Sequence, residues 1–251
     1  MYSASSRDLA ARARVTDSHT VVDLCGGTGT TAEAILALAP PDADVVSLDS
    51  APAMQRIGRR TLSDPRLSWV TARAEELAEH APAGGVDAVV CNSAIWKTDV
   101  PAVFTAVRRV LRPGGRFVFN VGGGFAGVTH PDARARPARP TLGTLIEQIA
   151  ARENGTRPTP KRDTPQLPLA AVTSHLTTAG LTLVETDVTA QYTTVAERRA
   201  WLSISVFARP EHGFSYEQKM SMLSEAVAQT EPDDVTVTSR LVVVAELPET
   251  S

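Results

Sequence analysis

The sequence has only two cysteines and no apolar run long enough to cross a membrane. A membrane-spanning helix needs about 18 consecutive apolar residues, and none of the runs approaches that length. The first residues, MYSASSRDLAARARV, also lack the apolar core of a secretory signal. Few cysteines without such a signal predict a protein of the reducing cytoplasm, with no membrane partner.

The sequence has no excess of positive charge either. It carries 25 Lys and Arg against 28 Asp and Glu, a net charge of −3, and its pI is about 6.0. This balance gives no electrostatic reason to expect nucleic acid as a partner. The spacing of histidines and cysteines matches no metal site, which disfavours metal-dependent catalysis.

What the sequence does contain is an alternation of two patterns. Short apolar runs predict strands, and between them apolar residues recur at helical spacing. The alternation predicts a parallel sheet covered on both faces, with ligands at the carboxyl ends of the strands. The strands are expected at 21–24, 45–48, 67–71, 86–91 and 116–121, and the helices at 30–39, 54–62, 73–80 and 100–111.

This regularity stops after Val121. Residues 122–168 are rich in proline and basic residues and are too long for a structureless connection, so we expect a lid or insertion with a helix at 141–153. The alternation then resumes. Helices are predicted at 169–179, where Gly180 ends the first, and at 196–207 and 216–229, with strands at 181–188 and 235–245. We therefore expect a single domain over 1–251, with its core at 15–121 and 169–251 and a lid at 122–168.

The most informative stretch is VVDLCGGTGT at 21–30. Glycines allow positive φ and let a ligand approach the main chain, and the first strand-to-helix turn aims free N–H groups at that ligand. The spacing differs from the G-x-G-x-x-G dinucleotide pattern, and a tight structural turn would also explain it. Asp49 closes the next apolar run, where an acid can accept both hydroxyls of a ribose or cap a helix.

Further motifs stand at consistent positions: TARAEEL at 71–77, VDAVVCNSAIW at 86–96 and VRRVLRPGGRFVFNV at 107–121. With the glycine loop they resemble the class I S-adenosylmethionine-dependent methyltransferases. The resemblance covers about residues 15–121, with a weaker echo at 169–187. It implies a Rossmann-like, doubly wound α/β fold with a seven-stranded, mostly parallel sheet and helical lid insertions.

The resemblance assigns cofactor-binding residues one by one. The family loop is acid-x-Gly-x-Gly-x-Gly, so Asp23 is the acid and Cys25 stands where the first glycine is usual. Asp49 would hold the ribose, Ser50 and Met54 would flank the adenine, and the adenine amine would fall to Ala74 and Glu75 because Arg73 replaces an acid. The residues implied to bind S-adenosylmethionine are Asp23, Cys25, Gly26, Gly27, Gly29, Asp49, Ser50, Met54, Ala74, Glu75, Asn92, Ser93 and Ala94.

Four residues are candidates for the chemistry itself. Trp96 follows the fourth strand and could face the sulfonium, or it could be core packing. Asn120 ends the fifth strand and could position a substrate or cap a loop. His130, in the lid, is the histidine expected nearest a substrate, and Tyr192 follows the sixth strand. Basic residues of the lid could attract an acidic substrate or form a solvated loop: Arg134, Arg136, Arg139, Arg157, Lys161 and Arg162.

The sequence therefore predicts an enzyme that methylates a small molecule in secondary metabolism or natural-product biosynthesis. We expect it to act as a monomer or homodimer. The lid and the segment after the sixth strand would form the substrate roof. An alternative keeps the cofactor but changes the bond that breaks. Because the sulfonium activates all three attached carbons, an enzyme could instead transfer the aminocarboxypropyl arm or cyclise that arm.

Overall fold

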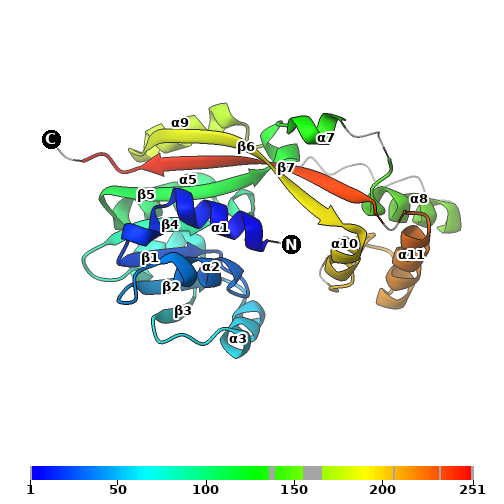
Figure 1. Ribbon diagram of the computed structural model, residues 1–251, viewed down its shortest axis with the longest axis horizontal. Helices are drawn as coiled ribbons and strands as arrows, with labels where there is room; N and C mark the ends of the chain where they lie inside the picture. Colours follow the sequence, from blue (N-terminus) through cyan, green and yellow to red (C-terminus); the bar gives the residue numbers. More distant parts are fainter. Residues whose placement is uncertain (1, 136–138, 155–165, 206, 232, 250–251) are drawn as a thin grey trace. The chain divides into compact units, whose positions relative to one another are not determined.

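The computed structural model describes residues 2–135, 139–154, 166–205, 207–231 and 233–249, and it contains the predicted seven-stranded sheet (Figure 1). The strand order is β3-β2-β1-β4-β5-β7-β6. Strands β1 to β5 pair in parallel, and β7 pairs antiparallel with β5. The predicted mostly parallel, Rossmann-like sheet is confirmed.

The strands are β1 Thr20–Leu24, β2 Asp44–Asp49, β3 Leu67–Thr71, β4 Val86–Cys91, β5 Leu111–Gly122, β6 Thr182–Thr194 and β7 Val235–Glu246. The α-helices are α1 Ser3–Arg12, α2 Thr30–Leu38, α3 Pro52–Thr61, α4 Leu77–His80, α5 Val100–Val110, α6 Gly123–Ala126, α7 Pro131–Ala135, α8 Leu142–Asn154, α9 Leu169–Ala179, α10 Val195–Leu202 and α11 Tyr216–Ala228. Short 3₁₀ turns lie at η1 Val15–Asp17, η2 Ala74–Glu76 and η3 Ile95–Lys97.

The central strands β1 and β4 are buried on both faces, because successive side chains point to opposite sides and helices cover each side. In β1, Val21 belongs to the core under α1 and α2, whereas Val22 belongs to the core under α4, α5 and α9. Ala88 and Val89 divide in the same way in β4. Continuous apolar runs in the sequence therefore mark strands with no solvent face.

Local signals set the ends of several helices. The side chain of Asp99 accepts a hydrogen bond from Ala102 N and so caps the start of α5. Gly180 ends α9 with φ of 79°, as the sequence predicts. Strand β5 begins earlier than predicted, at Leu111, and its pairing with β4 shifts register between Val86 and Ala88.

Other features also differ from the sequence expectation. Helices α1, α6 and α7 had no predicted counterpart. Strand β6 runs to Thr194 instead of ending near Val188, so Tyr192 lies inside the strand and not after it. Helix α10 ends at Leu202, short of the predicted Phe207.

The chain divides into two compact units. The core unit comprises residues 2–129, 165–189 and 239–251, and the second unit comprises 130–164 and 190–238, so β6 and β7 contribute residues to both. The second unit has its own apolar cluster, in which Ile146 of α8 and Met222 of α11 are almost fully buried. Within the described part of the chain, no helix combines the length and apolar character needed to cross a membrane.

Candidate functional site

The glycine loop after β1 adopts a conformation that few residues other than glycine accept. Gly27 has φ of 59° and Gly29 has φ of 89°, and Cys25, at the position of the usual first glycine, has φ of 58°. Cys25 therefore tolerates the left-handed conformation, at a cost of about 1–2 kcal/mol. Its thiol lies beside that of Cys91 at the end of β4, and both cysteines are free thiols.

Gly26 is fixed by a different constraint, which is space. A Cβ atom there would lie 2.2 Å from Asp23 Oδ2 and 2.3 Å from Ser47 Oγ. Gly27, in contrast, has no heavy atom within 4 Å of the place a Cβ would take. The loop is thus packed tightly beneath Gly26 and has room for a side-chain atom at Gly27.

Asp23 is a buried carboxylate under this loop. Its Oδ2 accepts hydrogen bonds from Ala32 N and Ser47 Oγ, both at 3.1 Å, whereas its Oδ1 is buried without a partner. Burial raises the pKa of Asp23 from 3.8 to about 7, against the two hydrogen bonds and with some help from Asp49. An unpartnered buried oxygen favours either a proton or a cationic group of a ligand.

Asp49, at the end of β2, connects the glycine loop to the next helix. Its Oδ2 accepts from Gly27 N at 2.9 Å, and its Oδ1 accepts from Ala51 N at 2.7 Å, just before α3. The side chain is half-buried. The interpretation of Asp49 as a helix cap is wrong, because the N-cap residue of α3 is Ala51 and no side chain caps that helix. The carboxylate instead orders the turn before α3 and keeps lone pairs for a ribose.

A polar cluster lies at the ends of β4 and β5. Asn120 is fully buried, and its Oδ1 accepts from Ser93 N at 2.8 Å, holding Ser93 at φ of 61°. Its Nδ2 donates to Asn92 Oδ1 at 2.9 Å and to Ser5 Oγ of α1 at 3.0 Å. The structure therefore brings together the predicted Asn92, Ser93 and Asn120. These contacts are compatible with a loop-fixing role for Asn120, and its contact with a substrate stays a prediction.

The serines of α1 are site residues that sequence reasoning missed. Ser5 Oγ donates to Asn92 Oδ1 at 3.2 Å, and Ser6 Oγ accepts from Asn92 Nδ2 at 3.0 Å. Ser6 also shares a hydrogen bond with Thr31 of α2. The signal was the pair of adjacent serines in a segment with no predicted element, and it was too weak to use alone.

Trp96 lies in η3, just beyond β4. Its indole stacks on Phe125 of α6, with ring centroids 4.9 Å apart and an angle of 25° between the planes. Both rings are half-buried and pack against the core. Phe125 therefore covers one face of the indole, as the packing interpretation requires. The contact of Trp96 with the sulfonium of the cofactor stays a prediction.

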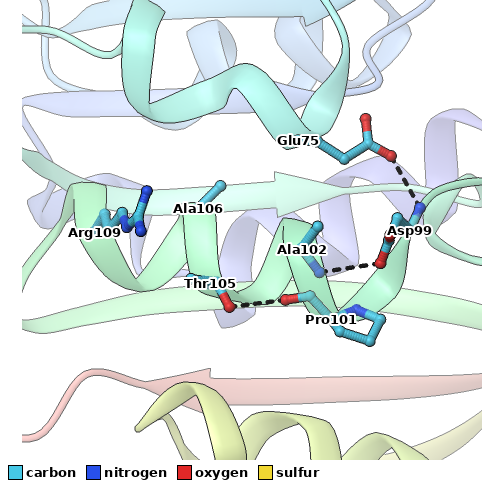
Figure 2. Close-up of a pocket in the computed structure, with 7 residues that line it drawn as sticks. All are labelled: Glu75, Asp99, Pro101, Ala102, Thr105, Ala106 and Arg109. Carbon is cyan, nitrogen blue, oxygen red and sulfur yellow. Dashed lines mark hydrogen bonds between the residues drawn. The ribbon is translucent and has the colours of Figure 1, made fainter.

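The residues predicted near the adenine follow β2 and β3. Ser50 is exposed, Met54 of α3 is half-buried and Ala74 of η2 is buried. Ala94, predicted at the methionine end of the cofactor, is half-buried. Glu75 faces the start of α5, where its Oε1 accepts from Asp99 N at 2.9 Å (Figure 2). Burial, which alone would raise the pKa of Glu75, is outweighed by hydrogen bonds that include this one, so the pKa lies below its usual value.

His130 and Tyr192 belong to the second unit, whereas Trp96 and Asn120 belong to the core unit. Asp132 connects the first two, because its N–H donates to His130 Nδ1 at 3.1 Å and its carboxylate accepts from the Tyr192 hydroxyl. Of the basic lid residues, Arg136, Arg157, Lys161 and Arg162 lie outside the described residues. Among the residues that are described, no three His, Cys, Asp or Glu side chains gather as metal ligands.

Comparisons with known proteins agree with this architecture. Residues 21–115 match the family model of a methyltransferase domain. A trans-aconitate 2-methyltransferase of Azoarcus sp. (strain BH72) is 38% identical over 112 residues, which cover 44% of this chain and 42% of that protein. The chain thus matches less than half the length of this curated relative.

Solved structures share the fold over nearly the whole chain. The [4+2]-cyclase SpnF superimposes with a TM-score of 0.59 at 15% identity, covering 99% of this chain and 81% of that one. A geranyl diphosphate methyltransferase in complex with S-adenosylmethionine gives 0.54 at 14% identity, covering 98% and 85%. At such identities the likeness shows the fold alone.

Proposed function

We propose that the protein transfers a methyl group from S-adenosylmethionine to a small-molecule acceptor, because residues 21–115 match the model of a methyltransferase domain. The observation that carries the proposal is the loop after β1, in which Gly26 packs on Asp23 and Gly27 donates to Asp49. When bound, the cofactor supplies a methyl group activated by a sulfonium cation. The protein's task is then to bind and orient the two reactants in line.

The residues present fit this cofactor. Asp49 offers a carboxylate to a ribose, and the open space at Gly27 suits close approach of a ligand to the main chain. Asp23 Oδ1, buried and unpartnered, suits a cationic ligand such as one with an ammonium group. The loop carries no lysine, as expected for a cofactor without phosphates to hold.

Other parts of the proposal rest on the sequence. We propose a cytoplasmic monomer or homodimer that acts on a metabolite in natural-product biosynthesis, with residues 122–168 as the lid. A carboxylic acid is one acceptor to try first, since the relative from Azoarcus is named for trans-aconitate. His130 and Tyr192 stay candidates for contact with the acceptor.

Product analysis separates the proposal from its rival. The protein is incubated with S-adenosylmethionine alone and with pools of small metabolites, and the products are identified by mass spectrometry. Methyl transfer yields S-adenosylhomocysteine, whereas attack on the methionine arm yields methylthioadenosine. The test is needed because the same fold also occurs in a protein named as a cyclase.

Replacing Asp49 with alanine should weaken binding of S-adenosylmethionine by about 10- to 100-fold, the effect of losing hydrogen bonds to a charged group. Calorimetry on the folded variant measures the dissociation constant. Asp44→Ala is the matched control, because Asp44 is an exposed acid at the other end of β2. If the two variants bind S-adenosylmethionine with equal affinity, the role of Asp49 is limited to ordering the turn before α3.

Replacing Trp96 with leucine should weaken the binding of S-adenosylmethionine more than the binding of S-adenosylhomocysteine. An indole over the sulfonium favours the cation by about 0.5–2 kcal/mol, and the product is neutral at sulfur. Both dissociation constants are measured on the same variant. A loss of equal size for the two ligands, together with a lower melting temperature, would leave Trp96 as a packing partner of Phe125 only.

A further inference from the structure

The only two cysteines of the sequence come together beside the glycine loop. Cys25 is the first residue after β1, and Cys91 is the last residue of β4. Strands β1 and β4 pair in parallel, with Asp23 opposite Val90. One residue further along, Leu24 stands opposite Cys91, and Cys25 follows at once. The two cysteines therefore occupy neighbouring positions at the carboxyl edge of the sheet.

The spacing of the main chain suits a covalent bond between the two thiols. Neighbouring strands lie about 4.8 Å apart and consecutive Cα atoms about 3.8 Å apart, so the Cα atoms of Cys25 and Cys91 are about 6 Å apart. Disulfides join cysteines whose Cα atoms are about 4.4–6.8 Å apart. The side chains also approach each other, because the two thiols share a hydrogen bond and pack in one apolar cluster. A disulfide between them thus requires no rearrangement of the sheet.

The two sulfur atoms differ in their access to reagents. Cys25 is partly exposed in the loop, whereas Cys91 is fully buried. The hydrogen bond with Cys25, together with burial, raises the pKa of Cys91, so that thiol stays protonated and donates. Cys25 is therefore the sulfur that a dissolved reagent meets first. Cys91 reacts only with a group that is already attached to Cys25.

The backbone at Cys25 gives a second reason to expect a function for this thiol. Its φ of 58° lies in the left-handed region, which favours glycine, and glycines follow it at 26, 27 and 29. A residue that keeps an unfavourable φ in a ligand loop points to a role for its side chain. Glycine would fit this position without strain, so the thiol is what cysteine adds to the loop.

We propose that Cys25 and Cys91 form a reversible disulfide that displaces the glycine loop and weakens its binding of the cofactor. The oxidant is a small disulfide such as oxidised glutathione. The sulfur of Cys25 attacks it, the S–S bond of the reagent breaks, and one glutathione leaves with the proton of Cys25. Cys91 then attacks the sulfur of Cys25, and the second glutathione leaves with the proton of Cys91. The two cysteines are oxidised, and one glutathione disulfide is reduced to two thiols.

Closing this bond pulls the loop toward β4. An S–S bond of about 2.05 Å is shorter than any contact between two thiols, and Cys91 lies in a buried central strand, so Cys25 is the residue that moves. The next two residues are tied to β2, on the opposite side of β1. Gly26 N donates to the main chain of β2 at 3.1 Å, and Gly27 N donates to Asp49 Oδ2 at 2.9 Å. Movement toward β4 therefore stretches both hydrogen bonds.

The test treats the full chain with oxidised glutathione. Peptide mapping by mass spectrometry should find a disulfide between Cys25 and Cys91 with no glutathione attached, and dithiothreitol should reverse it. In the oxidised protein, the amides of Gly26 and Gly27 should exchange with solvent at least about tenfold faster than in the reduced protein. The dissociation constant for S-adenosylmethionine should rise by about tenfold or more, and it should recover on reduction.

Two variants test the order of the steps. Cys91→Ala should stop at a glutathione adduct on Cys25, because no second thiol is present to displace the glutathione. Under reducing conditions this variant should bind S-adenosylmethionine as the native protein does. Cys25→Ala should leave Cys91 unreacted, since that thiol is fully buried. The melting temperature of each variant is measured alongside, so that exposure of a thiol by unfolding is not mistaken for its reaction in the folded protein.

The proposal is overturned if the native protein stops at a glutathione adduct, if neither cysteine reacts, or if the disulfide forms without faster exchange at Gly26 and Gly27. It is also overturned if the reduced and oxidised proteins bind S-adenosylmethionine equally tightly. Only this last comparison rests on the proposed function. If the reduced protein does not bind S-adenosylmethionine at all, the methyltransferase proposal fails, while mapping and exchange still decide whether the disulfide displaces the loop.

Discussion

Replacing Gly26 with alanine is expected to lower the free energy of unfolding by about 3 kcal/mol, the upper part of the range for overpacking a filled interior. The new Cβ would lie 2.2 Å from Asp23 Oδ2, 2.3 Å from Ser47 Oγ and 2.7 Å from Asp23 Cγ. Asp23 and Ser47 are buried in β1 and β2, in the middle of the sheet. Because neither side chain can retreat into solvent, the main chain must shift or the Asp23–Ser47 hydrogen bond must break.

Gly27→Ala is the control in the same loop. Its Cβ would meet nothing within 4 Å, so the variant should lose only about 1–2 kcal/mol for the left-handed φ of 59°. Urea unfolding of the two variants measures the difference. The expectation fails if Gly26→Ala loses no more stability than Gly27→Ala, which would mean that the neighbouring side chains of Asp23 and Ser47 move aside for the new Cβ.

The glycine loop and the strands near it show which features could be predicted from the sequence alone. The order of residues predicted a ligand loop after β1, and the apolar runs predicted β3 at Leu67–Thr71 and β4 at Val86–Cys91 with their observed bounds. The run in β4 is reliable because both faces of that strand are covered, whereas β3 is a partly exposed edge strand. Cys25 could not be predicted, since its φ of 58° depends on the packing around it.

The parts that were missed depend on contacts between distant residues. Helix α1 presents few large apolar side chains, and its Leu9 is buried in a cluster formed with α2 and the sheet. The contact between Asn120 and Ser5 joins positions 115 residues apart, and no local pattern encodes it. Strand β6 runs past Val188 through mostly polar residues because β7 lies beside it in the sheet.

The pKa of Asp23 predicts an unusual dependence of stability on pH. A carboxyl whose pKa rises from 3.8 in the unfolded chain to about 7 in the folded protein binds more protons when folded throughout that interval. The contribution of Asp23 to stability is therefore full below about pH 4, declines as the pH rises, and is lost above pH 7. The total change is about 4 kcal/mol, at 1.36 kcal/mol for each unit of pKa.

Asp23→Asn removes this titration while keeping the shape and an acceptor for Ala32 N and Ser47 Oγ. The free energy of unfolding of the native protein, minus that of the variant, should fall by several kcal/mol between pH 4 and pH 8. Urea unfolding at matched ionic strength measures it at each pH. Asp44→Asn, at an exposed carboxyl of β2, is the control and should run parallel to the native protein. If the free energy of unfolding of Asp23→Asn also changes with pH in parallel with that of the native protein, Asp23 is ionised in the folded state at both pH values. The unpartnered Oδ1 would then be a buried charge already in place for a cationic ligand, not a site that a proton occupies first.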